Sequence, residues 1–186
     1  LAPYRHDPAA ARALLAEVRR PAGEALAITY KTSSRPLRVR LATIIQHQLG
    51  RVGLDVDVRS YDWGTFYGDI KAGRFQMYSL SWVGIKMPDI FRYVFHSDSL
   101  PPAGANRGRY RNPRVDELID RAEAATDLET QARLYRELQA VLHRELPYVP
   151  LWYEDHVALH RPHVRGYRVP LDGNYDGLAE VRWGDG

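Results

Sequence analysis

Hydrophobic residues recur along the chain at two different spacings, and their order predicts the fold class. In "LDVDVRSY", Leu54, Val56 and Val58 occupy every second position, which is typical of a strand with one buried face. Two further apolar runs, "ALAITY" at 25–30 and "RFQMYSLSW" at 74–82, are typical of buried strands. Segments with helical spacing lie between these strands, so the sequence predicts an α/β fold in which helices flank a mixed sheet.

Cap and turn residues predict where the first helices begin and end. Asp7 and Pro8 begin a helix in "HDPAAARALLAEVRR", because an aspartate can accept a hydrogen bond from the first turn and proline fits there. Apolar residues at helical spacing in 37–49 predict a second helix. A third is capped by Asp62 and ends before Gly73.

The second half of the chain predicts two amphipathic helices after a loop at 97–112. Their apolar stripes consist of Val115, Leu118, Ile119 and Ala122 in the first helix and of Leu128, Leu134, Tyr135, Leu138, Val141 and Leu142 in the second. The following "YVPLWYEDHVALHR" predicts one or two strands, and the segment from Pro162 is rich in turns.

Composition narrows the class of protein. A chain of 186 residues with 45% hydrophobic content can form one core of ordinary size. No apolar run reaches the roughly 18 residues that a transmembrane helix needs. Cysteine is absent, which excludes disulfides, thiolate zinc sites and thiol catalysis. Because the chain begins at Leu1 without an initiator methionine, we expect it to be a piece of a longer protein.

The sequence contains no catalytic signature. Nucleophile-elbow, zinc-protease, phosphate-loop and dinucleotide-binding motifs are all missing, so we expect neither enzymatic activity nor a cofactor. On a strand, His156 and His160 would share a face and could hold a metal ion, with His163 nearby. No acidic ligand stands at a suitable spacing, so we interpret them as surface histidines and predict no metal site.

An arginine-rich stretch, "NRGRYRNPR", has three interpretations. Arginines beside a tyrosine can follow a nucleic-acid backbone. The net charge is only +3, however, and acidic residues follow at once, so we expect no nucleic-acid partner. The alternatives are an arginine fork that faces an anionic or hydroxyl-rich small ligand, and a solvated loop.

In α/β sheets, ligands bind at the carboxyl ends of the strands, which here are the loops at 32–35, 60–63 and 82–86. Aromatic faces for stacking and a few polar groups for orientation are typical of a small-solute site. Trp63 also lies on the apolar face of its helix, so the alternative to ligand binding is that it belongs to the core. The predicted ligand-binding residues are Ser33, Arg35, Tyr61, Trp63, Trp82, Gly84, Ile85, Lys86, Asn106 and Arg107.

The chain also resembles a known family. The stretches "LATIIQHQLGRVGLDVDVRSYDWGTFYGDIKAGRFQMYSLSWVG", "PDIFRYVFHSD", "YRNPRVDELIDRAEAATDLETQARLYRELQAVLHRELPYVPLWY" and "VRGYRVPLDG" occur in one order. In this order they resemble the C-terminal region of the family 5 extracytoplasmic solute-binding proteins, which serve peptide, dipeptide and nickel ABC importers. The likeness covers nearly the whole chain.

The resemblance implies one α/β lobe of a two-lobed periplasmic-binding-protein-like fold. It implies that residues 1–163 are the C-terminal ligand-binding lobe and that 164–186 return to the other lobe. The implied partners are a small-molecule or peptide ligand, an ABC permease in the membrane and the N-terminal lobe. The implied location is the periplasm, or the outer face of the cytoplasmic membrane with a lipid anchor. A sensory or interaction receptor on the same fold is the alternative, and a nucleic-acid-binding module that uses the arginine-rich loop is a weaker one.

Two departures from the family pattern bear on the ligand. Peptide-binding branches hold an aspartate shortly after the tryptophan, where it pairs with the ligand's amine, but here Ile85 takes that place. Lys86 adds a positive charge, and no nearby residue in the sequence neutralises it. The dipeptide branch binds the ligand's carboxylate with an arginine where this chain has Thr32, with Arg35 nearby. Both departures shift the expectation from short peptides towards an uncharged, anionic or longer ligand.

Overall fold

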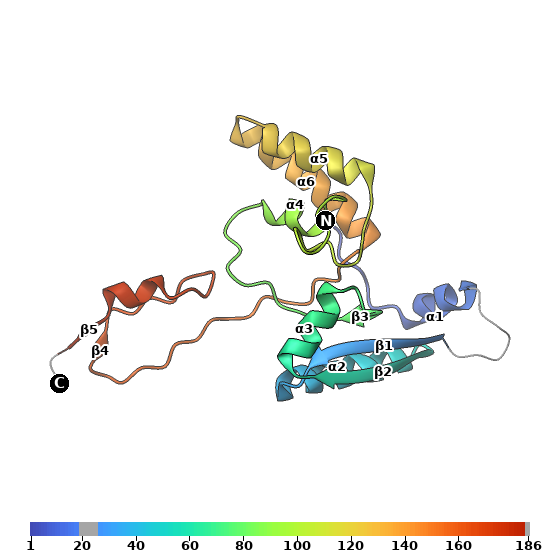
Figure 1. The fold of residues 1–186 in the computed structure, drawn as a ribbon, viewed down its shortest axis with the longest axis horizontal. Coiled ribbons are helices and arrows are strands. Elements are labelled where there is room, and N and C mark those ends of the chain that lie inside the picture. The colour runs from blue at the N-terminus through green and yellow to red at the C-terminus, as the bar shows by residue number, and fades with distance from the viewer. Residues whose placement is uncertain (19–25, 185–186) are drawn as a thin grey trace. The chain divides into compact units, whose positions relative to one another are not determined.

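The computed structural model describes residues 1–18 and 26–184, so residues 19, 20 and 25 of the predicted elements lie outside it. The chain forms two compact units (Figure 1). The sheet unit consists of Leu1–Leu80 with Val94–Pro113, and the helix-pair unit consists of Ser81–Tyr93 with Arg114–Gly186. Each unit is therefore assembled from separate stretches of sequence.

The sheet unit is built on three parallel strands in the order β2–β1–β3. β1 (Leu26–Ser33) pairs with β2 (Leu54–Tyr61) along its whole length, from Leu26 opposite Leu54 to Ser33 opposite Tyr61. The α/β class is confirmed. The predicted mixed sheet is in fact parallel, and the antiparallel pair of β4 (Val164–Arg165) and β5 (Arg182–Trp183) is a separate sheet of the other unit.

β3 (Met77–Tyr78) is much shorter than the strand predicted at 74–82. On one side of the pairing, the Gln76 side-chain Oε1 accepts the Thr29 N–H at 2.7 Å, so a side chain replaces a main-chain partner. On the other side, the Ser79 hydroxyl accepts a hydrogen bond from the Tyr30 hydroxyl at 2.8 Å. Side-chain bonds to β1 flank the two paired residues, and regular pairing stops there.

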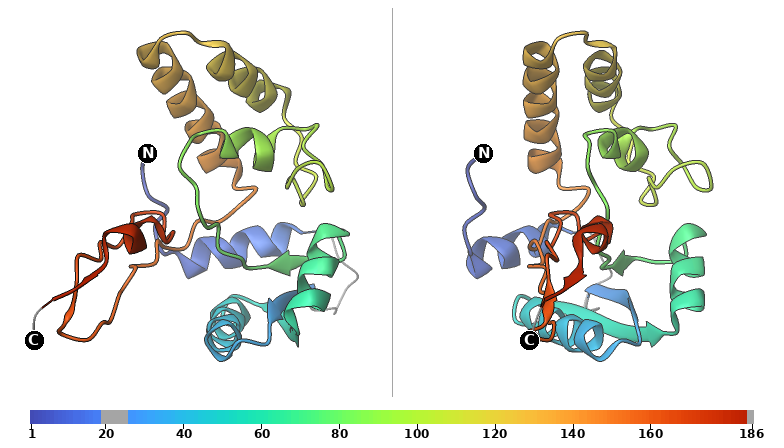
Figure 2. Two further views of the ribbon diagram at one scale, coloured as in Figure 1. Left: turned by 60° about the vertical axis from the view of Figure 1, so that its left-hand side comes forward. Right: turned by 90° about the vertical axis from the view of Figure 1, so that its left-hand side faces the viewer.

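Two helices cover opposite faces of this sheet (Figures 1 and 2). α2 (Pro36–Gly50) packs through Ala42 on the face that carries Tyr30 and Val56. That core is completed by Ile45, Leu49, Leu54, Val58 and Met77. α3 (Trp63–Lys71) buries Phe66 and Ile70. Right-handed crossovers to either side of a central strand place successive helices on opposite faces, which is the arrangement found here.

A polar contact ties α3 to its face of the sheet. Lys31 on β1 lies 2.7 Å from Asp69 on α3, and both side chains are largely buried. Arg74 contacts the other oxygen of the same carboxylate at 2.8 Å. The hydrogen bond from Lys31, and after it that from Arg74, holds the pKa of Asp69 below its usual value.

The predicted caps are confirmed. Asp7 accepts the Ala10 N–H at 2.9 Å and begins α1 (Pro8–Glu17). Asp62 accepts the Thr65 N–H at 3.1 Å and begins α3. Gly73 follows α3 with φ +73°, a left-handed backbone conformation that glycine adopts without steric cost because it has no Cβ.

In the helix-pair unit, α5 (Pro113–Ala124) and α6 (Leu128–Glu145) lie side by side (Figures 1 and 2). α4 (Ile90–Phe95) begins in this unit, where Arg92 pairs with Glu123 of α5 at 2.6 Å. The α5 stripe is confirmed, because its four residues Val115, Leu118, Ile119 and Ala122 are fully buried.

Four of the six residues in the predicted α6 stripe are buried, Val141 is half-buried, and the first residue is exposed. Leu134, Tyr135, Leu138 and Leu142 are buried, whereas Leu128 is 83% exposed. Leu128 is the first helical residue, and helical side chains lean towards the N-terminus, so its side chain extends past the end of the packed stripe.

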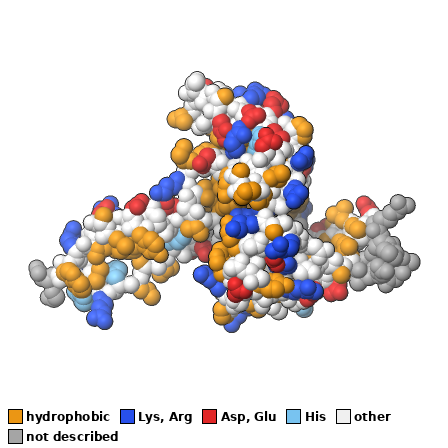
Figure 3. Space-filling model, viewed as in Figure 1, with side chains coloured by type: hydrophobic (Ala, Val, Ile, Leu, Met, Phe, Trp, Pro, Cys, Tyr) orange, Lys and Arg blue, Asp and Glu red, His pale blue; other side chains and the backbone are white. Residues whose placement is uncertain are grey.

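The strands predicted at 148–161 are wrong. Within the described residues this segment pairs with no strand, and it leads into β4, the 3₁₀ helix η1 (Asp176–Glu180) and β5. Figure 3 shows hydrophobic side chains (orange) at the surface along this part of the chain. The large exposed ones in the segment are Val149, Leu151, Trp152, Tyr153, Val157 and Leu159. Apolar residues form a strand only when another strand pairs with them, and the pairings found among the described residues do not include this segment.

Among the residues that the structure describes, no helix is both long enough and apolar enough to cross a membrane.

Candidate ligand-binding site

The carboxyl ends of β1 and β2 form the rim of the sheet unit, as the sequence predicts for the loops at 32–35 and 60–63. Ser33 lies opposite Tyr61, and the neighbouring Ser34 N–H donates to the Tyr61 carbonyl at 2.7 Å. The ammonium of Lys31 lies 5.4 Å from the centre of the Tyr61 ring. Ser33 is buried and Arg35 is exposed, so the two predicted ligand-binding residues of this loop differ in access.

Thr32, at the position where the resemblance places an arginine, is also buried. Its side chain is 1% exposed, and within the described residues its Oγ1 has no hydrogen-bond partner. A buried hydroxyl at this position cannot supply the positive charge that binds a carboxylate. The structure therefore leaves the departure from the family pattern in place.

Trp63 is at the surface and not in the core. As the first residue of α3 it is 55% exposed, although it shares a helical face with apolar residues. Its ring stacks on that of Tyr67, with centroids 5.3 Å apart and an angle of 6°. Stacking fixes one face of the indole and leaves the rest of the ring for contact with a solute.

Asn106 and Arg107 are buried in the loop at 97–112. The Asn106 amide donates to the carbonyls of His96 at 3.1 Å and Tyr110 at 2.7 Å, and its oxygen accepts the Tyr110 N–H at 2.8 Å. Arg107 donates to the Tyr67 hydroxyl at 3.3 Å. These bonds give Asn106 a structural role in holding the loop, which the sequence alone did not indicate.

The other four predicted residues belong to the helix-pair unit. Trp82 is 37% exposed, and the edge of its ring system meets Tyr93 at a centroid distance of 6.2 Å. It does not end a strand as predicted, because regular pairing stops at Tyr78. Gly84, with φ +74°, turns the chain, and Ile85 beyond it is 44% exposed.

Lys86 is neutralised, contrary to the expectation from the sequence. Its ammonium lies 3.1 Å from Asp172 and 3.7 Å from Asp176. The Asn174 amide donates to both carboxylates, at 3.0 and 2.6 Å, and so holds them together. The partners lie far along the chain in a turn-rich segment, so no local signal could identify them. The cluster carries one positive and two negative charges.

The pKa values of this cluster follow from its contacts. The hydrogen bond that Lys86 donates to Asp172, and after it the negative charge of Asp172, raises the pKa of Lys86. Partial burial acts to raise the pKa of Asp172, but the Lys86 hydrogen bond and the Asn174 N–H outweigh it and the pKa is lowered. Both shifts favour the charged forms, so the pair stays ionised at neutral pH.

His156, His160 and His163 occupy separate environments. The His156 ring lies so close to Gly173 that an added Cβ there would stand 2.5 Å from it. His163 stacks on Trp183 at 4.8 Å, and His160 contacts the Arg161 carbonyl at 3.1 Å. Among the described residues, no three histidine, aspartate or glutamate side chains stand close enough to hold a metal ion.

Comparison with known proteins places these features in a wider group. The family described as bacterial extracellular solute-binding proteins, family 5 Middle, matches residues 1–100. Di/tripeptide-binding protein 2 of Pseudomonas aeruginosa is 31% identical over 169 residues, which is 89% of this chain and 32% of that protein. The dipeptide-binding protein of Escherichia coli is 28% identical over 176 residues, 92% of this chain and 33% of its own.

A solved structure agrees with these relatives. The ABC transporter-associated periplasmic binding protein DppA from Helicobacter pylori, in complex with the peptide STSA, superposes with a TM-score of 0.82 at 27% identity. The match covers 100% of this chain and 36% of that one. The chain thus spans about a third of the length of the proteins that it matches.

Proposed function

Since the chain belongs to the bacterial extracellular solute-binding proteins of family 5, we propose that the protein captures a small solute and delivers it to the permease of an ABC importer. The relatives that it matches are binding proteins, and the protein acts by binding rather than by catalysis. The chain supplies one ligand-binding lobe, residues 1–163, and residues 164–186 return to a second lobe of the same protein. The complete protein works outside the cytoplasmic membrane, in the periplasm or anchored to its outer face.

The observation that carries this proposal is the exposure of aromatic rings in the segments that follow β2 and β3. Trp63 and Trp82 are 55% and 37% exposed; Trp63 packs against Phe66 and Tyr67, and Trp82 packs against Tyr93. Rigid, partly exposed rings beside polar turns are suited to stacking on a solute at low entropic cost.

We further propose that the solute is a short peptide. The sequence argued against this because Lys86 would repel a ligand's amine. Asp172 and Asp176 remove that objection, since the cluster of three carries one more negative than positive charge. The names of two relatives point the same way, being a di/tripeptide-binding and a dipeptide-binding protein.

The test is a ligand screen on the complete protein. Thermal unfolding is followed with a library of di- and tripeptides, and with oligosaccharides and chelated nickel as the alternative classes. A ligand that binds only the native state raises the melting temperature with its concentration. We expect peptides to do so. Stabilisation by one of the other classes, with no response to any peptide, would overturn the peptide assignment, and no response to any solute would overturn solute capture.

A further inference from the structure

A groove of about 430 Å³ lies in the sheet unit between the start of α1 and the end of α2. Residues 5–8, 11 and 12 line one side of it, and residues 48, 49, 51 and 52 line the other. The apolar members of the lining are half-buried, whereas the polar members are exposed; the apolar ones are Pro8, Ala11, Leu49 and Val52. The groove therefore has an apolar floor between polar edges.

The edges of the groove carry an excess of positive charge. Arg5, Arg12 and Arg51 belong to the lining, and none of their guanidinium groups has an ion-pair or hydrogen-bond partner among the described residues. Asp7 is the one carboxylate in the lining, and it also caps α1. With His6 neutral, three positive charges and one negative charge give the lining a net charge of +2.

Local structure accounts for one of these arginines but not for the other two. The carbonyl end of a helix favours a cation, so Arg51, which follows α2, is stabilised where it stands. Arg5 precedes and Arg12 follows the first turn of α1, and the amino end of a helix does not favour positive charge. Like charges around one groove repel each other, and a bound anion would relieve that repulsion.

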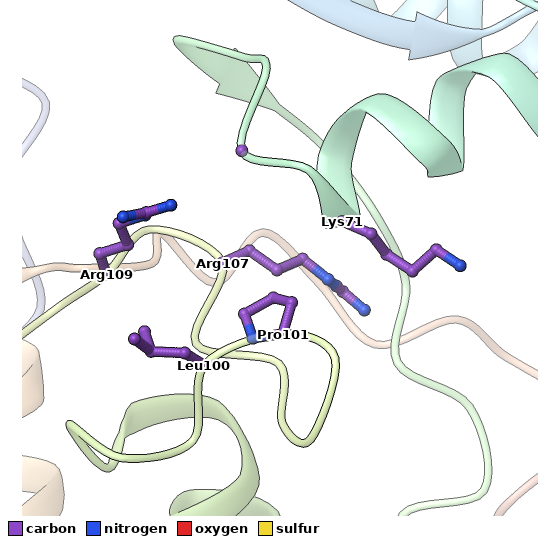
Figure 4. A pocket seen from close by; sticks show the side chains of 6 residues that line it. Lys71, Leu100, Pro101, Arg107 and Arg109 are labelled. Atoms are coloured by element: carbon purple, nitrogen blue, oxygen red, sulfur yellow. The ribbon is translucent and has the colours of Figure 1, made fainter.

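A second cavity of the sheet unit, of about 90 Å³, is less suited to an anion. Lys71 and Arg109 both line it, but Figure 4 shows that their charged ends are directed away from each other. The cations of that cavity therefore do not converge on one small group.

The size of the larger groove favours a small molecule over a protein partner. Small-molecule sites usually measure roughly 300–1,000 Å³. A stable protein interface uses about 20–30 residues on each side, whereas ten residues line this groove. Guanidinium groups match the oxygens of phosphates and carboxylates. No aromatic ring belongs to the lining, so the floor suits an aliphatic group better than one that requires stacking.

We propose that this groove binds an aliphatic organic anion, whose phosphate or carboxylate head contacts the arginines and whose hydrocarbon body covers the floor. Such a ligand would hold α1, which has no fully buried residue, against α2. The site is separate from the proposed solute site. α2 has 15 residues and is about 22 Å long at 1.5 Å per residue, and the groove lies at the opposite end of it from the sheet's rim.

Titration calorimetry on the complete protein at constant ionic strength tests the proposal. Octyl phosphate and octanoate are the probes, below the concentrations at which they form micelles. Octanol lacks the charge and inorganic phosphate lacks the hydrocarbon body. Burial of even two methylene groups corresponds to roughly tenfold in affinity, so inorganic phosphate should bind at least about tenfold more weakly than octyl phosphate. Octanol should also bind more weakly, and the tighter of the two octyl anions identifies the head group.

Arg12→Gln and Arg51→Gln alter exposed side chains, so both variants should fold. An exposed charge pair contributes up to about fivefold in affinity, so each variant should bind octyl phosphate about three- to fivefold more weakly, and the double variant about tenfold or more. The control is Arg40→Gln, which removes an equal charge from an exposed position of α2 outside the lining. It should change the affinity by less than about twofold.

Three results would each overturn the proposal: no binding of either octyl anion to the wild type, octanol binding as tightly as octyl phosphate, or equal weakening by the control variant. Stabilisation by peptides should be the same in the double variant as in the wild type, because the groove lies away from the sheet's rim. The groove can therefore fail while solute capture holds, and the reverse.

Discussion

Replacing Trp82 by alanine is the sharpest perturbation of the proposed solute site. The side chain is 37% exposed and its ring meets Tyr93 edge-on, so truncation removes a surface that is open to a solute. If the solute stacks on that surface, the loss appears as weaker binding rather than as unfolding. The proposed peptide ligand makes this measurable, because binding stabilises the native state.

The size of the effect follows from the exposed area. A tryptophan offers up to about 250 Å², so the 37% that is exposed amounts to roughly 90 Å². At about 25 cal/mol per Å², complete coverage by the solute is worth ~2.3 kcal/mol and half coverage ~1.1 kcal/mol. Because ~1.4 kcal/mol corresponds to tenfold in affinity, Trp82→Ala should weaken binding by about 6- to 50-fold.

The assay compares peptide-induced stabilisation of the wild type and the variant at one peptide concentration. At 100 times the Kd the wild type gains about 2.7 kcal/mol, whereas a variant that binds 50-fold more weakly gains only about 0.6 kcal/mol. Trp152→Ala is the matched control, since Trp152 is 50% exposed and lies in the segment at 148–161, to which we assign no ligand contact. Equal stabilisation of Trp82→Ala and the wild type would remove Trp82 from the site.

Further predictions concern the two units. Leu118→Ala should lower the free energy of unfolding by ~2–5 kcal/mol because the side chain is fully buried. Leu128→Ala should lower it by less than ~0.5 kcal/mol because that side chain is 83% exposed. Denaturant titration measures both losses, and equal losses would contradict the packing. Tyr30→Phe should cost about 1 kcal/mol by chemical denaturation, since it removes only the buried hydroxyl bond, and a neutral result would show that this bond adds nothing. Asp69, whose pKa Lys31 lowers from 3.8, should stabilise the fold above about pH 4 and lose that contribution as the pH falls through its lowered pKa. Thermal unfolding of Asp69→Asn should thus lack this acid-side loss, and parallel curves for variant and wild type would refute the assignment.

Local patterns predicted those elements whose causes are local. Caps at Asp7 and Asp62 depend on a side chain and a backbone N–H three residues away, so the sequence contains all of the information. The alternation in β2 and the stripe of α5 likewise report one buried face each. The errors at β3 and at 148–161 have the opposite origin. A strand requires a neighbour from elsewhere in the chain, and apolar composition does not say whether one is present.

The candidate site divides in the same way. Exposure of Trp82 could be anticipated from its position before a glycine turn, whereas the apolar helical face on which Trp63 lies favoured a core position for that residue. The neutralisation of Lys86 could not, because Asp172 and Asp176 come from a distant segment with no periodic pattern. Nor could the burial of Arg107, which depends on the ring of Tyr67 one turn into a helix that the loop at 97–112 meets only in the folded chain.

The two departures from the family pattern therefore carry unequal weight in choosing a ligand. The departure at Ile85 and Lys86 argued against a peptide because the charge of Lys86 had no partner in the nearby sequence. Asp172 and Asp176, which Asn174 holds together, supply that partner and give the cluster a net negative charge. The one at Thr32 remains, because a buried hydroxyl offers no positive charge to a carboxylate. For the peptide ligand proposed above, charge recognition should consequently be stronger at the amine than at the carboxyl end, and stacking on the exposed part of Trp82 would then contribute affinity that a second charge contact would otherwise provide.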